Sequence, residues 1–247
     1  MNSPDGAAAG SLPLPGGDYL ERVYWWAYVR PWAVRFFDRG WLVNLILFGN
    51  YRRLREAAFG ALGDLQSGTT LQVACVYGDF TPALLRRHGS AAKLQVLDRL
   101  PVQLRALRKK LPADSRVELS VGDAAGHALP SASVDRVVLF FLLHEMPAEV
   151  REATVAEAWR VLKPGGRVVL VDYHRAVWWH PLRPLMRLVF DGLEPFAREL
   201  ARTPLRQLCP EALVPFREEK RTFFGGLYQL VVWTRGLEGR IGGDVIV

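Results

Sequence analysis

Several residues that could do chemistry stand directly after short apolar runs. The run LQVACV leads into a loop of small and polar residues, Ala74-Cys75-Val76-Tyr77-Gly78-Asp79. Twenty residues beyond Gly78 the run KLQVLD ends at Asp98, and the next run ends in Gly122-Asp123-Ala124. A small-residue loop before a helix lets the backbone approach a ligand, and a carboxylate at this offset can accept both hydroxyls of a ribose. The spacing predicts a nucleoside site, in which Asp123 is placed to bind an adenine amine.

Each of these residues also has a plainer interpretation. A strand-terminal acid such as Asp98 often caps a helix, but its offset from Gly78, together with the later Gly122-Asp123, favours the ligand-binding interpretation. Cys75 is predicted to be a small packing residue, because the sequence fixes no base beside it.

A second group of polar residues follows the two later apolar runs. VDRVVLFFLL opens onto His144 and Glu145, while Asp172 and His174 stand at the end of GRVVLVDYH. The carboxyl ends of parallel strands meet at one edge of a sheet, so His144, Asp172 and His174 are expected to converge on the nucleoside site. His144 equally fits a buried histidine whose hydrogen bonds are satisfied, and Glu145 could simply begin the next helix.

The elements that must position these residues alternate between strand and helix. Five short, almost wholly apolar runs read as strands covered on both faces, with helices at 82–88, 101–111 and 147–162 between them. The alternation predicts an α/β fold with a doubly wound, mostly parallel sheet. The segment TFFGGLYQLVVWTR reads as a hairpin turning at Gly225-Gly226, which would close the sheet with antiparallel strands.

Three regions differ in composition. Residues 1–18 are predicted to be a flexible tail, 19–66 a helical, aromatic-rich lid or membrane-contact segment, and 67–247 the ligand-binding domain. That domain carries a helical insertion at about 176–215. Within it, apolar residues at helical spacing from Leu182 to Phe190 form a stripe, which either covers the sheet or, beside Trp178 and Trp179, meets a membrane surface.

Composition narrows the function classes. The 247 residues include 32 Lys plus Arg against 25 Asp plus Glu, a net charge of +7, together with eight Trp. The positive charge is interleaved with Trp and Leu, which favours an anionic membrane surface over nucleic acid.

No apolar run is long enough to span a bilayer. The two cysteines form no CxxC pair, so neither a disulfide framework nor a thiolate zinc site is indicated. A cytoplasmic protein, peripheral on the cytoplasmic membrane face, is expected.

The order of these motifs resembles the class I S-adenosylmethionine-dependent methyltransferases, over roughly residues 67–175 and again in the final hairpin. The likeness is greatest to quinone-pathway members whose loop reads like VLDVACGTGDLT, where this chain has TLQVACVYGDFT. The resemblance implies a Rossmann-like fold and S-adenosylmethionine as cofactor. The residues it implies for cofactor binding are Gln72, Ala74, Val76, Tyr77, Gly78, Asp79, Asp98, Arg99, Asp123 and Ala124.

Two positions depart from that pattern. The acid that usually lies near the cofactor's amino group is Gln72, and a loop glycine is replaced by Val76, followed by Tyr77. Without a carboxylate partner, the neutral and nucleophilic form of that amine becomes more accessible.

The VACVYGDFT loop, the HEMP tetrapeptide and the aromatic N-terminal region resemble the rhodoquinone-biosynthesis enzymes related to ubiquinone methyltransferases. That resemblance implies exchange of a ring methoxy group of ubiquinone for an amino group, with S-adenosylmethionine as amino donor and Mn²⁺ required. In this hypothesis His144, Asp172 and His174 supply a base, Asp172 and His174 are candidate metal ligands, and Tyr77 donates a hydrogen bond to a developing oxyanion.

Two other functions remain open at this point. The same fold supports ordinary methylation of a prenylated phenol or quinol, and a degenerate pocket would suit a non-catalytic, membrane-associated binding protein. Methylation adds a methyl group to the substrate and releases S-adenosylhomocysteine, whereas amino transfer does neither. The sequence carries no signal for the oligomeric state.

Overall fold

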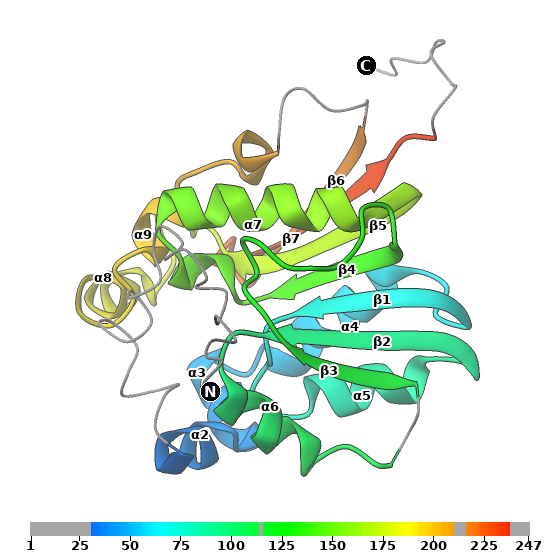
Figure 1. Cartoon of the computed structure of the whole chain (residues 1–247). Helices are drawn as coiled ribbons and strands as arrows, with labels where there is room; N and C mark the ends of the chain where they lie inside the picture. Colours follow the sequence, from blue (N-terminus) through cyan, green and yellow to red (C-terminus); the bar gives the residue numbers. More distant parts are fainter. Residues whose placement is uncertain (1–30, 114–115, 210–215, 238–247) are drawn as a thin grey trace, which may run out of the picture.

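The computed structural model describes residues 31–113, 116–209 and 216–237 (Figure 1). They form a seven-stranded sheet of order β3-β2-β1-β4-β5-β7-β6. The first five strands pair in parallel, while β7 pairs antiparallel with both β5 and β6. The predicted α/β fold with an antiparallel C-terminal hairpin is confirmed. The strands are β1 (Ser67–Val73), β2 (Ala91–Asp98), β3 (Val117–Val121), β4 (Val134–Phe140), β5 (Leu162–Tyr173), β6 (Phe216–Phe223) and β7 (Tyr228–Arg235).

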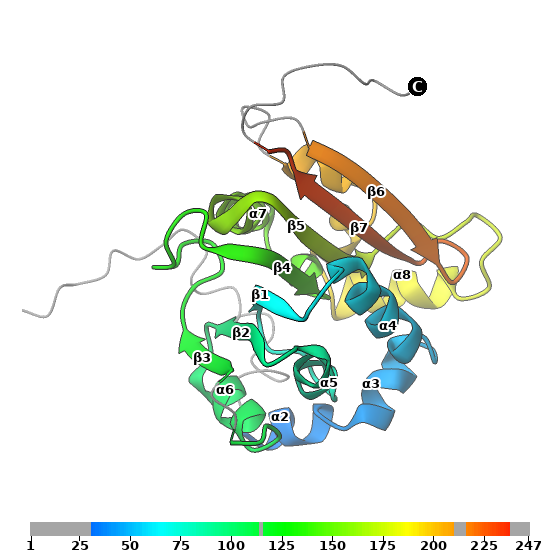
Figure 2. The same cartoon turned by 90° about the vertical axis from the view of Figure 1, so that its right-hand side faces the viewer.

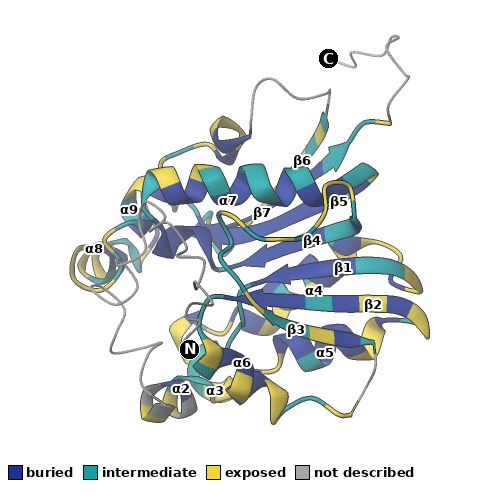
Figure 3. Ribbon diagram, in the orientation of Figure 1, coloured by how far each residue is buried: buried dark blue, intermediate teal, exposed yellow. Residues whose placement is uncertain are grey.

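Helices cover both faces of this sheet (Figure 2). Helices α4, α5 and α6 contribute to one apolar cluster and α7 to a second, on the opposite face. Strands covered on both faces need apolar side chains throughout, which explains the almost continuous apolar runs of β1, β4 and β5 (Figure 3). The described helices are α2 (Pro31–Phe37), α3 (Gly40–Ile46), α4 (Tyr51–Leu62), α5 (Phe80–Arg87), α6 (Pro101–Arg108), α7 (Ala148–Val161), α8 (Arg183–Gly192) and α9 (Ala197–Leu200), with the 3-10 segments η2 (Leu143–Glu145) and η3 (Leu205–Leu208).

Two strands end earlier than their apolar runs suggest. Strand β1 ends at Val73 and β4 at Phe140, because the next residue in each case has a positive φ, +67° at Ala74 and +53° at Phe141. A left-handed residue cannot continue a strand. The remaining apolar residues of both runs therefore become loop residues at the carboxyl edge of the sheet.

The N-terminal region and the insertion both lie near that edge. Three short helices, α2, α3 and α4, occupy the described part of residues 19–66, as predicted. The predicted tail at 1–18 lies outside the described residues, and so do Trp25 and Trp26. In α8 the predicted apolar stripe is split: Met186 and Phe190 are buried, whereas Leu185 is 44% exposed. Within the described ranges, no helix has the length and apolarity that crossing a membrane requires.

Candidate functional site

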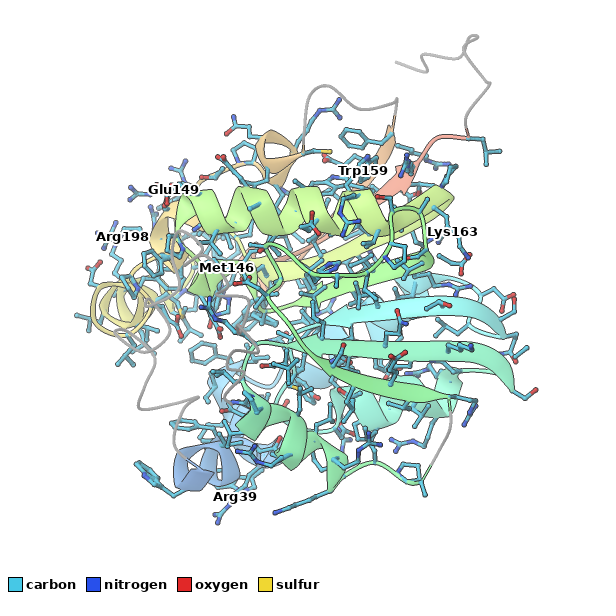
Figure 4. All side chains as sticks on the ribbon, in the orientation of Figure 1. Arg39, Met146, Glu149, Trp159, Lys163 and Arg198 are labelled. Carbon is cyan, nitrogen blue, oxygen red and sulfur yellow. The ribbon has the colours of Figure 1, made fainter. Side chains whose placement is uncertain are left out.

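A cavity of about 520 Å³ lies at the carboxyl edge of the parallel strands. Its inner part is formed by the loops that follow β1, β2, β3 and β4, and its outer wall by apolar side chains of α3 and α8. Met146, another lining residue, lies toward the end of the sheet that carries α8 and α9, far from Lys163 at the other end (Figure 4). The predicted site residues that line this cavity are Ala74, Val76, Tyr77, Asp98, Arg99, Asp123, Ala124 and His144.

Asp98 ends β2 and lies on the cavity wall, almost fully buried. The Cys75 N–H donates to its Oδ2 at 2.6 Å and the Leu100 N–H to its Oδ1 at 2.8 Å. Burial raises the pKa of the Asp98 carboxyl, and the two backbone donors oppose that shift. A carboxylate oxygen accepts more than one hydrogen bond, so Asp98 can still receive the hydroxyls of a sugar.

Asp123 and Arg99 form a second polar corner of the cavity. Their side chains are paired at 3.2 Å, and Asp123 Oδ1 also accepts the Ala125 N–H at 2.8 Å. These contacts fix the loop after β3, so that Gly122 and Ala124 present a small surface to the cavity. A flat ring could lie against that surface.

The loop after β1 is anchored from the N-terminal helices. Gly78 has φ +83°, and a Cβ atom there would lie 3.0 Å from the Tyr51 hydroxyl of α4, so only glycine fits. Its N–H donates to Asp38 Oδ1 at 2.9 Å, and Lys110 Nζ donates to the same Asp38 oxygen at 2.6 Å. Asp79 faces α4 instead, where it accepts from Tyr51 and Arg55. Neither Gly78 nor Asp79 lines the cavity.

Gln72 lies beneath the loop and is fully buried. Its Nε2 donates to the Ala74 carbonyl at 2.9 Å, and its Oε1 accepts from the Thr81 hydroxyl at 3.0 Å. The amide offers a donor and an acceptor at once, so the side chain joins the end of β1 to the start of α5. It does not reach the cavity wall.

Tyr77 and Cys75 keep their protons in this site. The Tyr77 hydroxyl accepts from Gln103 Nε2 at 2.9 Å, and its ring stacks on Phe37 of α2 with centroids 6.5 Å apart. Burial raises the pKa of both the Tyr77 hydroxyl and the Cys75 thiol well above the usual ranges. A protonated Tyr77 hydroxyl at the cavity wall is a hydrogen-bond donor, the role assigned to it from the sequence.

His144 lies among three carboxylates. Its Nδ1–H donates to Asp172 Oδ1 at 2.9 Å, while Nε2 lies 3.9 Å from Glu145 Oε1 and 3.8 Å from Glu194 Oε2. Burial alone would lower the pKa of His144, but Asp172, Glu194 and Glu145 outweigh it and raise the pKa to about 10. The ring is therefore a buried cation at neutral pH, with Nε2 on the cavity side.

Asp172 and His174 lie outside the cavity lining. Asp172 accepts N–H groups from Leu143, His144 and Tyr173 besides the His144 ring. His174 donates from Nδ1 to the Gly226 carbonyl at 2.8 Å and lies 3.1 Å from Lys220 Nζ through Nε2. Burial and Lys220 lower the pKa of His174.

Among the described residues, no group of three or more His, Cys, Asp or Glu side chains is arranged to hold a metal ion. The assignment of Asp172 and His174 as metal ligands stays a prediction. The hydrogen bonds of both side chains do not favour it, because they occupy Asp172 Oδ1 and His174 Nδ1 with protein partners.

Two carboxylates of the site were not identified as such from the sequence. Glu145 belongs to η2 rather than to the start of α7, which begins at Ala148, and its side chain lines the cavity. Glu194 follows α8 and reaches the cavity from the insertion. No spacing rule links Glu194 to His144, because only the return of the chain through α8 brings them together.

Comparison with known proteins gives a family match to the central part of this chain. The model described as a methyltransferase domain matches residues 70–166, which span the strands β1 to β4 and the start of β5.

Demethylmenaquinone methyltransferases are similar to this chain over more than half of its length. That of Bacillus licheniformis is 29% identical over 129 residues, covering 52% of this chain and 55% of that protein. That of Staphylococcus aureus (strain MRSA252) is 31% identical over 136 residues, covering 55% of each chain. The chain thus spans about half the length of the curated relatives it matches.

Solved structures extend the likeness of the fold beyond that stretch. A S-adenosylmethionine-dependent methyltransferase from Aquifex aeolicus superposes with a TM-score of 0.58 at 17% identity, over 83% of this chain and 98% of that one. An O-methyltransferase family protein from Burkholderia thailandensis gives 0.60 at 20% identity, over 80% and 59%. At these identities the similarity establishes the Rossmann-like methyltransferase fold.

Proposed function

We propose that this chain, whose residues 70–166 form a methyltransferase domain related to those of quinone methyltransferases, transfers a methyl group from S-adenosylmethionine to a prenylated quinol. The observation that carries the proposal is the continuity of one cavity. It runs from the buried carboxylate of Asp98 to an apolar wall made by α3 and α8. A nucleoside and a hydrophobic ring can therefore meet in it.

The residues at the inner end fit S-adenosylmethionine. Asp98 is buried, lies on the cavity wall and ends β2, where a carboxylate meets a ribose in this fold. Ala74 lines the cavity with only a methyl group, and Gly122 has no side chain because a Cβ atom there would lie 2.6 Å from Leu97 Cδ1. When bound there, S-adenosylmethionine supplies an electrophilic methyl group on a positively charged sulfur.

The outer wall fits an isoprenoid-bearing substrate. Leu45, Ile46 and Phe48 line it from the N-terminal side, and Met186 and Val189 from α8. Transfer of such apolar surface out of water stabilises the bound state by roughly 25 cal/mol per Å². The wall suits the chain of a quinol rather than a small polar substrate. The relatives named demethylmenaquinone methyltransferases support the same substrate class.

The surface around the outer wall suits delivery from a membrane. Large apolar side chains are exposed on both elements that form the wall: Trp41 and Leu45 on α3, and Leu188 on α8, with Trp178 before it 81% exposed. Exposed tryptophan beside arginine is typical of segments that lie at a membrane interface. We propose that the N-terminal helices and the insertion form a lid through which a membrane-bound ring reaches the cofactor.

One observation favours a second candidate, the exchange of a ring methoxy group for an amino group. Gln72 is held by Ala74 and Thr81, and the side chains of Val76 and Tyr77 project into the cavity where a glycine loop would be open. The cofactor's amine would then lack the usual acidic partner at position 72. In this candidate ubiquinone is the acceptor and rhodoquinone the product, and Mn²⁺ is the metal that the resemblance to the rhodoquinone-biosynthesis enzymes implies.

Product analysis separates the two candidates. Purified protein is incubated with S-adenosylmethionine and either a prenylated quinol or ubiquinone with Mn²⁺, and the products are identified by mass spectrometry. Methyl transfer gives a quinol heavier by one methyl group and an equal amount of S-adenosylhomocysteine. Asp98→Asn should abolish that product, whereas Asp191→Asn, a change at an exposed carboxylate of α8, should not. An aminated ring would refute methyl transfer and support the second candidate.

A further inference from the structure

Gly78, in the loop after β1, has both of its backbone polar groups bound by charged side chains from other parts of the chain. Its N–H donates to Asp38 Oδ1 at 2.9 Å, and its carbonyl accepts from Lys110 Nζ at 2.8 Å. Lys110 Nζ also donates to Asp38 Oδ1 at 2.6 Å, which closes a ring of three contacts. Hydrogen bonds to charged groups are stronger than those between neutral groups, so this ring, the Gly78 clamp, holds the peptide groups of Gly78 firmly.

The clamp joins two helices to the loop. Asp38 follows α2 and Lys110 follows α6, and these helices lie side by side (Figures 1 and 2). The two charged side chains are mostly shielded from water, with 15% of Asp38 and 26% of Lys110 exposed, so their attraction is screened less than that of a surface pair. On the other side of Gly78 stands the Tyr51 hydroxyl. The loop is therefore confined from two directions at this residue.

Helix α6 also connects the loop to the carboxylate at the end of β2. At the start of the helix, its N-cap residue donates an N–H to Asp98 Oδ1 at 2.8 Å. Within the helix, Gln103 Nε2 donates to the Tyr77 hydroxyl at 2.9 Å, and beyond its end Lys110 binds the Gly78 carbonyl. One helix thus fixes the spacing between the carboxylate on the cavity wall and the loop beside it.

The order of the strands indicates which part of S-adenosylmethionine meets this loop. The parallel strands lie in the order β3-β2-β1-β4. Asp123, after β3, is placed for the adenine, and Asp98, at the end of β2, for the ribose. The next groups along the cavity wall belong to the loop after β1, where Val76 and Tyr77 line the cavity. The part of the molecule that remains, the sulfur with its amino-acid arm, therefore faces this loop.

We infer that Asp38 and Lys110 are positioning residues for the amino-acid arm of S-adenosylmethionine. They hold Gly78, and Gly78 in turn fixes how Val76 and Tyr77 face the cavity. Neither Asp38 nor Lys110 lines the cavity, so both act through the loop and not by touching the ligand. The inference rests on the cofactor site of the proposed function, but it is independent of the acceptor and of the group that is transferred.

The test compares two ligands that differ in the arm. S-adenosylhomocysteine carries the amino-acid arm, whereas 5′-methylthioadenosine lacks it, and both are titrated calorimetrically into the full-length protein. In Lys110→Met we expect the affinity for S-adenosylhomocysteine to fall roughly tenfold, which corresponds to about 1.4 kcal/mol, while that for 5′-methylthioadenosine is unchanged. Lys110→Arg keeps a cation with several donors and should recover part of the lost affinity. A purely structural role would not separate the two ligands in this way.

The matched control is Lys163→Met. Lys163 also forms a partly exposed ion pair, with Asp135 at 3.0 Å, but it lies at the end of the sheet away from the cavity (Figure 4). Both ligands should bind to Lys163→Met as to the wild type. Equal losses for both ligands in Lys110→Met, or no loss for either, would overturn the inference alone. A wild-type protein that binds neither ligand would refute the cofactor site of the proposed function and this inference with it.

Exchanging the two charges separates the clamp from a simple ion pair. In the double variant Asp38→Lys/Lys110→Asp, opposite charges still face each other, but an ammonium would meet the Gly78 N–H and a carboxylate the Gly78 carbonyl. We expect the Tm of the double variant to recover toward wild type relative to Asp38→Lys and Lys110→Asp, while the affinity for S-adenosylhomocysteine stays low. Recovery of that affinity together with the Tm would show that the ion pair acts without holding Gly78, and would overturn the inference.

Discussion

At the scale of single residues, His144 and Asp172 behave as a fixed ion pair rather than as a proton relay. Four N–H groups donate to the Asp172 carboxylate, which does not line the cavity. Breaking a buried pair of this kind leaves an uncompensated charge. The pair therefore contributes to stability as well as placing the His144 ring.

The pH dependence of stability tests this pairing. The folded-state pKa of His144 is about 10 and the ordinary pKa of a histidine is 6.5, so its contribution is fully present below about pH 6.5 and is lost as the pH rises toward 10. The difference in free energy of unfolding between wild type and His144→Gln should shrink across that window in urea titrations. His174→Gln should show no such trend, because His174 is neutral throughout it. A constant difference between wild type and His144→Gln would contradict the pairing.

Gln72 gives a second test at this scale. In Gln72→Glu a carboxylate oxygen would face the Ala74 carbonyl at a fully buried position, with no proton to donate. We expect a loss of about 1–3 kcal/mol or more in the free energy of unfolding at pH 7, measured by thermal melting, and partial recovery at low pH where the carboxyl can donate. Gln207→Glu, at an exposed position, is the control. An unchanged Tm in Gln72→Glu would mean that the loop does not depend on this amide.

The cavity residues that could be predicted from the sequence stand at the last residue of a strand or in the loop after it. Asp98 and Asp123 line the cavity because the carboxyl ends of β2 and β3 must share one edge. Asp172 is still inside β5, where side chains alternate between faces, and its turn falls on the side away from the cavity. Spacing alone does not fix that alternation, since it depends on the register with β4 and β7.

At the scale of elements, helix α2 and the residue after it connect the N-terminal region to the loop after β1. Asp38, the residue after α2, accepts both the Gly78 N–H and the Lys110 ammonium, and Phe37 stacks on Tyr77. The contacts join three elements that are distant in sequence. A ligand that displaces Tyr77 must therefore also move α2.

Amide hydrogen exchange measures how strongly these contacts protect α2 and the loop after β1. Asp38→Asn removes the charge that holds the Gly78 N–H and Lys110, and each charge-assisted bond at a half-buried site is worth about 1 kcal/mol. We expect the Gly78 amide and the amides of α2 to exchange roughly fivefold faster in Asp38→Asn. Asp191→Asn should leave both unchanged. Equal protection of Gly78 in Asp38→Asn and wild type would show that α2 is held by its apolar contacts alone.

The type and order of the elements could be predicted from periodicity, but their ends could not. The hairpin at Gly225-Gly226 and the helix now seen at Ala148–Val161 follow directly from turn chemistry and apolar spacing. The early ends of β1 and β4 depend on left-handed residues, Ala74 and Phe141, that carry no glycine signal. Tertiary packing imposes those conformations, and it also brings Glu194 to the site.

At the scale of the whole molecule, large apolar side chains are exposed on α3 and on the insertion, two regions that also contribute apolar lining to the cavity. Trp41 and Trp178 are 61% and 81% exposed, and the nearby Arg39 and Arg187 are exposed too. Scattered apolar residues are normal on a surface, whereas a group at the mouth of an apolar cavity marks a binding surface. The net charge of +7 adds attraction toward anionic lipid.

Vesicle flotation tests the membrane proposal. The double variant Trp41→Ser/Trp178→Ser should float with anionic phospholipid vesicles to a much smaller extent than wild type, because each tryptophan contributes roughly 2 kcal/mol of interfacial burial. Val121→Ser removes a residue of similar exposure, 61%, on β3 and should float as wild type does. Equal flotation of the double variant and the wild type would place lipid contact elsewhere on the molecule or exclude it.

Calorimetric titration of the purified protein with S-adenosylhomocysteine tests the nucleoside site most directly, because it needs neither the acceptor nor the membrane. We predict saturable binding at one site, weakened at least about tenfold in Asp98→Asn, since a buried acceptor of two ribose hydroxyls is worth more than 1.4 kcal/mol. Asp191→Asn should bind as wild type does. No heat of binding with wild-type protein, or equal affinity in Asp98→Asn, would contradict a cofactor held by Asp98.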